Sequence, residues 1–220
     1  MNEDIAYSIG LIGGDGSLIS SDKENSLHIV DCSYDFHKNV ISPLFLRIFK
    51  KEPKISSMTT KLRRITYRSR FRDKEIVRYY LAFLPSKNKT YEMRTPLEIM
   101  NGGERIKIGY LRGWMDAEGS VTSTKTVRKS KIYVYPKITF QVANECIRNE
   151  LTSIMSQLGI HFTIWDYKNM RGFQIVGKHT RKYFDLVDFL HPEKTSRTRP
   201  NAAYSGWNNG LQLRKEELIP

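Results

Sequence analysis

Cysteines and long apolar runs are scarce in this chain. Only two cysteines, Cys32 and Cys146, occur among 220 residues, and their isolation excludes a disulfide framework and a cysteine-rich zinc site. No apolar run approaches the roughly 18 residues of a membrane span, so we expect no membrane partner. The chain starts with Met1-Asn2-Glu3-Asp4, which is acidic where a secretory signal would be basic. These features predict an intracellular globular protein, in the cytoplasm or nucleoid or inside an organelle.

Acidic residues are scarce in two particular stretches. Lys and Arg number 36 against 23 Asp and Glu, a formal net charge of +13. Residues 120–137 contain no acid, and residues 47–74 contain only Glu52 and Asp73 among many lysines and arginines. Both stretches also alternate between apolar and polar residues, as β-hairpins do. A merely solvated sheet face would explain polar residues but not charge of one sign, so we predict basic sheets that follow nucleic-acid phosphates.

The chain contains an internal repeat at an offset of 103 residues. Residues 7–18 align with residues 110–121, and the Tyr, the two Gly and the Ser of this segment are identical. Two related halves are the plainest explanation. The boundaries that we predict are 1–85 for the first half, 86–104 for a polar connector, 105–191 for the second half and 192–220 for a mostly irregular tail.

Each half has the hydrophobic pattern of a helix, a hairpin, a helix, a hairpin and a helix. The helices predicted in the first half are 4–16, 35–50 and 72–84, with strands at 17–21, 25–32, 53–59 and 62–70. The helices predicted in the second half are 105–118, 145–158 and 178–190, with strands at 120–127, 131–143, 161–167 and 171–177.

The first helix of each half carries a stripe of small residues. Gly10 and Gly113 lie at equivalent places in these stripes, and glycine inside a helix costs about 1 kcal/mol relative to alanine. Such a stripe is useful where two helices approach closely, so we predict that the two helices pack about a pseudo-two-fold axis. Asp15 and Glu118 would then lie together in the last helical turns, where the helix dipole disfavours carboxylates. A divalent cation at this point would explain the pair, whereas ordinary helix capping explains each motif alone.

The segments Ser8-Ile-Gly-Leu-Ile-Gly-Gly-Asp-Gly16 and Leu111-Arg-Gly-Trp-Met-Asp-Ala-Glu-Gly119 resemble the two motifs of the LAGLIDADG homing endonucleases, in their single-chain, double-motif form. The resemblance covers about residues 1–191. It implies an α+β fold of two pseudo-symmetric αββαββα halves, each with a saddle-shaped antiparallel sheet, joined through the packed motif helices. It also implies a monomer that cleaves both strands of double-stranded DNA with Mg²⁺, leaves short 3′ overhangs and needs no protein partner.

The resemblance assigns roles to residues at the helix ends. Asp15 and Glu118 match the catalytic acids, which would share two or three Mg²⁺ ions with help from the backbone carbonyls of Gly14 and Ala117. A polar residue that closes the second strand of each half helps to position water in this family. The residues expected to match are Asp31 and Asn144, and the lysines expected to complete the two sites are Lys87 and Lys194.

The residues that read DNA should project from one face of each sheet, because alternate side chains of a strand share a face. In the first half we predict DNA contacts from Ser26, His28, Lys54, Arg63, Arg64 and Tyr67. In the second half we predict them from Lys131, Lys137, Gln141, Trp165, Tyr167, Arg171 and Gln174. The strands of the two halves differ in sequence, so an asymmetric target of about 20 base pairs is expected.

Two other functions remain open on the sequence alone. Some members of this family became RNA-binding intron maturases, and a basic saddle suits RNA as well as DNA. A DNA-binding protein that kept the fold but lost cleavage is the second alternative. Both are binding functions, which a plasmid-cleavage assay with Mg²⁺ distinguishes from a nuclease.

Overall fold

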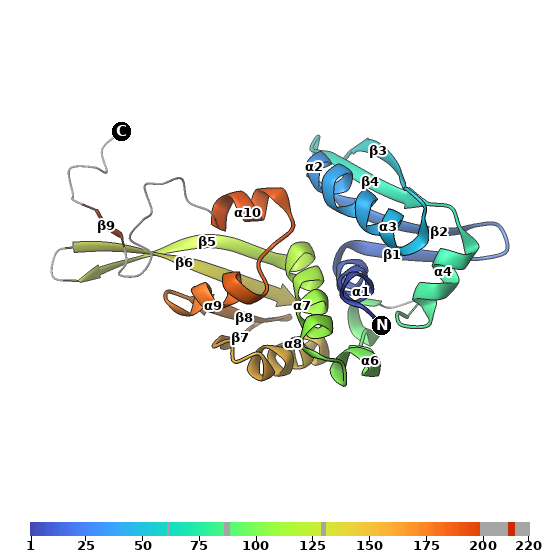
Figure 1. Ribbon diagram of the computed structural model, residues 1–220. Helices are drawn as coiled ribbons and strands as arrows, with labels where there is room; N and C mark the ends of the chain where they lie inside the picture. Colours follow the sequence, from blue (N-terminus) through green and yellow to red (C-terminus); the bar gives the residue numbers. More distant parts are fainter. Residues whose placement is uncertain (61, 86–88, 129–130, 199–210, 214–220) are drawn as a thin grey trace.

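Two antiparallel sheets lie on opposite sides of a central pair of helices (Figure 1). The computed structural model describes residues 1–60, 62–85, 89–128, 131–198 and 211–213. The central helices are α1 (Glu3–Asp15) and α7 (Glu104–Glu118). Strand order in the two sheets is β1-β2-β4-β3 and β5-β6-β8-β7, and β9 pairs with β6. The predicted α+β fold of two pseudo-symmetric halves is confirmed.

The first half has two hairpins, with helices on one face of their sheet (Figure 1). Its strands are β1 (Gly16–Ser20), β2 (Asn25–Asp31), β3 (Lys54–Thr59) and β4 (Ile65–Phe71). Its further helices are α2 (Tyr34–Phe36), the π-helix η1 (His37–Ile41), α3 (Ser42–Phe49) and α4 (Lys74–Leu81). The single helix predicted at 35–50 contains this π-helical turn because Pro43, in the first turn of α3, has no backbone N–H to donate.

The second half repeats this order with longer strands. Its strands are β5 (Gly119–Arg128), β6 (Lys131–Val142), β7 (Thr163–Tyr167) and β8 (Met170–Val176), with helices α8 (Glu145–Gln157) and α9 (His179–Leu186). Short helices α5 (Lys89–Glu92) and α6 (Leu97–Met100) lie in the connector. The tail contains α10 (Pro192–Thr198) and β9 (Leu211–Leu213), so the prediction of a mostly irregular tail fails for these residues.

The two central helices are parallel and their backbones touch. A Cβ added to Gly10 would overlap the carbonyl oxygen of Tyr110, and one added to Gly113 would overlap the carbonyl oxygen of Tyr7. These two contacts are related by the 103-residue offset of the repeat, as a pseudo-two-fold axis requires. The small-residue stripes therefore serve the close helix pairing that the sequence predicts.

The glycine that follows each motif acid is needed for space. Gly16 and Gly119 cap their helices with φ of −89° and −75°, which any residue can adopt. A Cβ at Gly16 would lie 2.6 Å from the Cα of Ile12, and one at Gly119 would overlap the carbonyl oxygen of Met115. The strand that starts at each glycine thus leaves the helix in a tight turn against its last turn. This turn brings the acid to the junction of helix and sheet.

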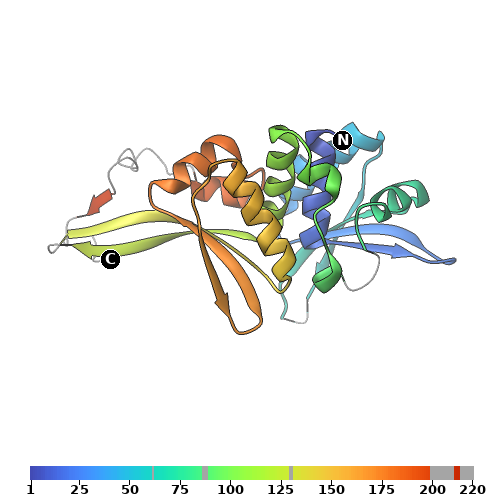
Figure 2. The ribbon, with the colours of Figure 1, turned by 90° about the horizontal axis from the view of Figure 1, so that it is seen from below.

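Each sheet buries one face against its own helices and leaves the opposite face without covering helices. Leu27, Ile29 and Phe71 lie in the core of the first half, and Phe140 and Phe173 lie in the core of the second. Figure 2 shows the molecule from below, with the strands of both halves spreading outward from the helix pair. Within the described residues, no helix is both long and apolar enough to cross a membrane. We call the uncovered side of each sheet its open face.

Replacing Gly113 by alanine should destabilise the protein. Alanine favours a helix by about 1 kcal/mol, but here the methyl group would overlap the Tyr7 carbonyl, so we expect a net loss of about 2–3 kcal/mol. The midpoint of thermal unfolding should then fall by about 4–12 °C. Gly103→Ala is the control, because an added Cβ there meets nothing within 4 Å. Equal midpoints for the two variants would contradict the proposed close packing.

Candidate functional site

The two motif acids lie at the same end of the paired helices. Asp15 is the last residue of α1 and Glu118 the last residue of α7. A Cβ added to Gly14 would overlap the Cβ of Ala117 and lie 3.2 Å from the Cγ of Glu118, so the final turns are in contact. Glu118 is exposed and Asp15 half-buried. Two carboxylates and the negative ends of two helix dipoles therefore meet at one accessible place.

Lys194 places a positive charge at this end of the helix pair. Its Nζ donates to the carbonyl oxygens of Met115 and Ala117, each at 3.1 Å, and also to that of Asp116. Burial lowers the pKa of Lys194, while the carboxylates of Asp116, Asp15, Asp31 and Glu118 oppose that shift. The sequence predicted this lysine near the acids, and it contacts the last turn of α7 directly.

The carboxylate of Asp116 accepts hydrogen bonds from segments of both halves. It is fully buried and accepts hydrogen bonds from Tyr7 Oη at 2.8 Å and from the backbone N–H groups of Leu190 and His191, each at 3.1 Å. Burial raises the pKa of Asp116, although these three hydrogen bonds and Lys194 act in the opposite direction. The sequence analysis missed this residue, although a second acid in the repeated motif, three residues before Gly119, was a usable signal.

The open face of the first sheet carries a row of basic side chains. Strand pairing places His28 opposite Arg70, and Arg70 opposite Lys54, so these three share a face. Leu27 and Phe71 point into the core, so their neighbours His28 and Arg70 point to the open face. Arg68 belongs to the same row, and burial, followed by the charges of Arg68 and Arg70, lowers the pKa of His28.

Of the four other contacts predicted in the first half, none is an exposed side chain of a strand on the open face. Tyr67 shares the core-side face with Ser69, and its ring centroid lies 5.3 Å from that of Tyr34 in α2, so the prediction that it reads DNA from the open face is wrong. Ser26 is on the open face but fully buried, and its hydroxyl donates to Glu24 at 2.8 Å. The predicted strand 62–70 begins only at residue 65. Two of the predicted contacts therefore lie in the exposed β3–β4 turn, namely Arg63 and Arg64.

The open face of the second sheet carries most of the contacts predicted there. Pairing with buried core residues fixes the alternation, and the residues on the open face are Lys137, Gln141, Trp165, Tyr167 and Gln174. The ring of Trp165 covers Gly172, where an added Cβ would overlap the indole. The side chain of Lys131 and the whole of Lys87 lie outside the described residues.

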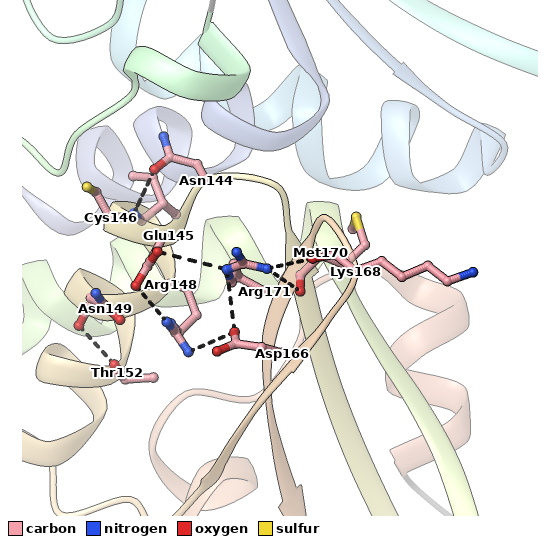
Figure 3. Close-up of polar contacts among 11 residues, drawn as sticks. Asn144, Glu145, Cys146, Arg148, Asn149, Thr152, Asp166, Lys168, Met170 and Arg171 are labelled. Carbon is pink, nitrogen blue, oxygen red and sulfur yellow. Dashed lines mark hydrogen bonds and ion pairs between the residues drawn. The ribbon is translucent and has the colours of Figure 1, made fainter.

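Arg171 faces the helices and takes part in an ion-pair cluster (Figure 3). Its Nε lies 3.6 Å from Asp166 and 3.9 Å from Glu145, at the start of α8. The buried Arg148 completes the cluster, with contacts of 3.3 Å to Asp166 and 3.4 Å to Glu145. The prediction that Arg171 reads DNA from the open face is therefore wrong. Its pairing instead fixes the β7–β8 hairpin against α8.

Comparison with known proteins identifies this architecture. Residues 105–185 match the family model of the LAGLIDADG-like domain. The structure is similar to the homing endonuclease I-DmoI in complex with DNA and Mn, with a TM-score of 0.60 and 18% identity over 84% of this chain and 96% of that one. The chain has the double-motif LAGLIDADG fold. A further match is the homing endonuclease I-WcaI bound to its DNA recognition sequence, with a TM-score of 0.60 and 18% identity over 90% of this chain and 87% of that one.

Two further proteins match this chain. The N-terminal LAGLIDADG domain of DUF199/WhiA has a TM-score of 0.54 and 14% identity, covering 84% of this chain and 80% of that one. An uncharacterized protein of Methanocaldococcus jannaschii is 25% identical over 177 residues, or 77% of this chain. This chain spans 60% of the length of that relative.

The strand pairing shows that the two residues expected to position water beside the LAGLIDADG acids do not occupy equivalent positions in the two halves. Gly16 pairs with Ile29 and Gly119 with Phe140, so the residue equivalent to Asp31 is Val142. Asn144 lies two residues further along and caps α8, accepting from Cys146 N at 3.0 Å and Ile147 N at 3.2 Å. Asp31 and Asn144 are therefore not equivalent, and the predicted symmetry of this pair is wrong.

Asp31 is held in the junction between the two halves. It accepts hydrogen bonds from Ser33 N at 2.6 Å and from His191 Nε2 at 3.2 Å, while the His191 ring lies 4.4 Å from that of Phe36. Burial acts to raise the pKa of Asp31, but these hydrogen bonds outweigh it and hold the pKa below its usual value. The hydrogen bonds around Asp31 thus give it a structural role in joining the two halves.

A cavity of about 260 Å³ lies beside Glu118. Gln141 and Asn144 line it together with Gly14 and with Met93 of the connector. The Nδ2 of Asn144 donates to the carbonyl of Met93 at 2.9 Å, so both functional groups of this amide have partners within the protein. Gln141, by contrast, is exposed on the open face and belongs to the same cavity as a motif acid.

Asp31→Asn should remove a pH-dependent contribution to stability. Because the folded-state pKa of Asp31 is lowered, its contribution is present above the unfolded-state pKa of about 3.9 and is lost as pH falls through the folded value. We expect the variant to be about 1–3 kcal/mol less stable at pH 7 and the difference to shrink below pH 4. Urea unfolding at a series of pH values measures this, with the exposed Asp35→Asn as control. A difference that is independent of pH would contradict the assignment.

Proposed function

We propose that this protein is a site-specific endonuclease that hydrolyses phosphodiester bonds in both strands of a double-stranded DNA target. The observation that carries the proposal is the meeting of Asp15 and Glu118 at the ends of two contacting helices, between two sheets with polar and basic open faces. Asp15 serves one strand and Glu118 the other, since each half contributes one acid. The similarity of the fold to I-DmoI and I-WcaI supports this function.

The donor atoms at the helix ends fit a divalent cation such as Mg²⁺. Carboxylate and carbonyl oxygens are its preferred ligands, and Asp15, Glu118 and the carbonyl of Gly14 supply them. The carbonyl of Ala117, which accepts a hydrogen bond from Lys194 Nζ, is a further candidate ligand. Within the described residues, no group of three or more His, Cys, Asp or Glu could hold a metal, so DNA oxygens would complete the coordination. Divalent ions bound at this place would supply Lewis-acid activation of the scissile phosphates and of water, and two or three of them are expected.

The remaining residues near the acids hold the site in shape. The ammonium of Lys194 offsets part of the negative charge at the α7 end and stands near the place where a phosphate would enter. We assign the equivalent role in the first half to Lys87. Asp31 and Asn144 act as positioning residues through His191 and Met93, rather than by contacting DNA.

The open faces support binding of a long, asymmetric duplex by one chain. His28, Lys54 and Arg70 occupy the first sheet, whereas Gln141, Trp165 and Gln174 occupy the second. Different side chains at corresponding positions present different donors and acceptors, so the two half-sites differ in sequence. One helical turn per half corresponds to about 20 base pairs in total. Both motif helices come from the same chain, so a monomer suffices to cut both strands and leave short 3′ overhangs.

Two alternative functions share the fold. The DUF199/WhiA domain shows that the LAGLIDADG fold does not by itself determine an activity, so a binding protein without cleavage is the first alternative. An RNA-binding maturase is the second. The retained pair of acids, with a lysine at the helix end, favours the nuclease over both, because a binding protein has no use for clustered carboxylates next to a phosphate.

Asp15→Asn and Glu118→Gln should each abolish double-strand cleavage and leave DNA binding intact, because these acids hold metal rather than reading bases. Neither variant should linearise, at a measurable rate, a plasmid carrying a target selected from a random library, whereas Glu104→Gln at the far end of α7 should cut normally. EDTA should stop cleavage without releasing the DNA. Wild-type cleavage by either acid variant would refute the assignment of the active site.

The two faces of the sheets should differ in their effect on DNA binding. Arg68→Gln on the open face should make the plot of log K against log salt shallower by about 0.9, because one phosphate contact is lost. The matched variant Arg171→Gln, on the helix side, should leave that slope unchanged and lower the thermal midpoint instead, since it breaks the cluster with Glu145 and Asp166. Fluorescence anisotropy over a salt series and thermal unfolding measure the two effects. The reverse pattern would show that the assignment of faces is inverted.

A further inference from the structure

The pairing of the strands aligns the open faces of the two sheets residue by residue. Gly16 pairs with Ile29 at the start of the first hairpin, and Gly119 pairs with Phe140 at the equivalent start in the second half. From this common start the pairing continues across each sheet, so an open-face residue of one half can be matched with its counterpart in the other. Two rows of open-face residues flank the start. We call the row on the side of the motif helices the inner row and the other the outer row.

The outer row is basic in the first half and uncharged in the second. In the order of the strands, the first sheet carries in this row Ser17, His28, Arg70 and Lys54. The same row of the second sheet carries Ser120, Thr139, Gln174 and Thr163. The serine is retained, whereas each basic side chain is replaced by a hydroxyl or an amide.

The inner row also loses its basic residue in the second half. In the first sheet this row carries Val30, Arg68 and Ser56. In the second sheet it carries Gln141, Gly172 and Trp165. Gly172 has no side chain at the position of Arg68, and a Cβ added there would overlap the indole of Trp165. The indole therefore covers the place from which the side chain of Arg68 projects in the first sheet.

The indole of Trp165 lies on the side of the sheet that is free of helices. Asp166 and Arg171, which are the chain neighbours of Trp165 and Gly172, lie in the ion-pair cluster beside α8 (Figure 3). Alternate residues of a strand point to opposite faces, so Trp165 points to the open face. Its side chain is only half-buried, which leaves an apolar surface exposed there.

These differences change the base edges that each sheet can recognise. The major groove of DNA admits a two-stranded β-ribbon, and the edges exposed in it differ between base pairs. Arginine and lysine bind the two acceptors of guanine, glutamine binds the donor and acceptor of adenine, and apolar groups contact the methyl group of thymine. The open face of the first sheet offers the first kind of group, whereas the open face of the second offers the other two.

We propose that Trp165 selects a thymine, by packing its indole against the 5-methyl group, in the half-site that the second sheet binds. Gln141 and Gln174 select adenines beside it, so this half-site is rich in A·T pairs. Arg68 and Lys54 favour guanine in the other half-site. Gln141 also lines the cavity beside Glu118, so the inner row lies at the end of the sheet near the motif acids. This inference rests on the proposed binding of double-stranded DNA and names the bases that the second half selects.

Replacement of thymine by deoxyuridine tests the contact directly, because it removes only the methyl group and keeps every hydrogen-bonding atom of the base. The probes are duplexes that carry a target selected from a random library, with each thymine replaced in turn and EDTA present to prevent cleavage. At one thymine the replacement should raise the Kd of the wild type about fourfold, the effect expected for one buried methyl group. Fluorescence anisotropy measures the Kd.

Trp165→Ala should bind the thymine and deoxyuridine duplexes equally at that position, because the group that contacts the methyl is gone. Ser56→Ala changes the equivalent position of the first sheet and is the matched control. This control should keep the fourfold difference. A variant that is merely less stable would bind all duplexes more weakly and would still distinguish thymine from deoxyuridine. Thermal unfolding checks that each variant is folded.

Selection from the random library tests the amides. The target that the wild type selects should have A·T pairs next to the thymine that is sensitive to Trp165. Gln174→Ala should select any base at one of these positions and should retain the thymine. Guanine or cytosine next to the thymine, or an unchanged target for Gln174→Ala, would contradict the proposed reading by amides.

The outcomes distinguish this inference from the function on which it rests. If no thymine of the target shows the difference in the wild type, or if Trp165→Ala keeps it, Trp165 does not select thymine, while specific binding stands. Loss of the difference in Ser56→Ala would place the contact on the first sheet and overturn the inference as well. If the wild type selects no target from the library, the proposed DNA binding itself is wrong.

Discussion

The close contact between α1 and α7 is the constraint on which the rest of the structure depends. Gly10 and Gly113 bring each helix backbone against the carbonyl of the tyrosine in the other helix. Because the helices are parallel, this contact also places their C-terminal ends side by side. The two acids, the two strand starts and the two sheets all take their positions from it. A larger side chain at either glycine would separate all of them at once.

The same contact also brings negative charges close together, and a lysine at the end of α7 offsets part of their repulsion. Parallel helices align their dipoles, and two carboxylates at their negative ends increase the repulsion. Lys194 reduces this repulsion at the C-terminal end of α7, where its Nζ donates to three backbone carbonyl oxygens. Asp116 is compensated differently, by Tyr7 and by two backbone N–H groups of the segment after α9. Asp15 and Glu118, the residues with a proposed role in chemistry, are more accessible than the buried Asp116.

Sequence reasoning was most successful where one pattern was repeated. The motif pair at a fixed offset predicted the helices, their contact and the location of the acids, since glycine stripes have few other uses. Sequence reasoning failed to assign the two faces of strands that are polar on both sides. The alternation of Tyr67, Arg68 and Ser69, for example, contains no aliphatic residue that shows which face is buried. The buried Phe71, two residues beyond Ser69 in the same strand, fixes the face of Tyr67 and Ser69 once the strand is seen to reach it. The bonds of Asp31 to His191 and of Asp116 to Leu190 were out of reach, since only the folded chain brings such distant residues together.

The segment from Leu190 to Lys194 has a consequence for the order in which the protein can form. It supplies the partners of Asp116, Asp31 and the last turn of α7, yet it follows every strand of the two main hairpin pairs in the chain. During synthesis from the N-terminus, the first half and α7 therefore leave the ribosome before their buried charges can be satisfied. The helix pair reaches its final stability only after residues 190–194 have been made. The site formed by Asp15 and Glu118 is thus completed late in folding, after the strands of the second half have been synthesised.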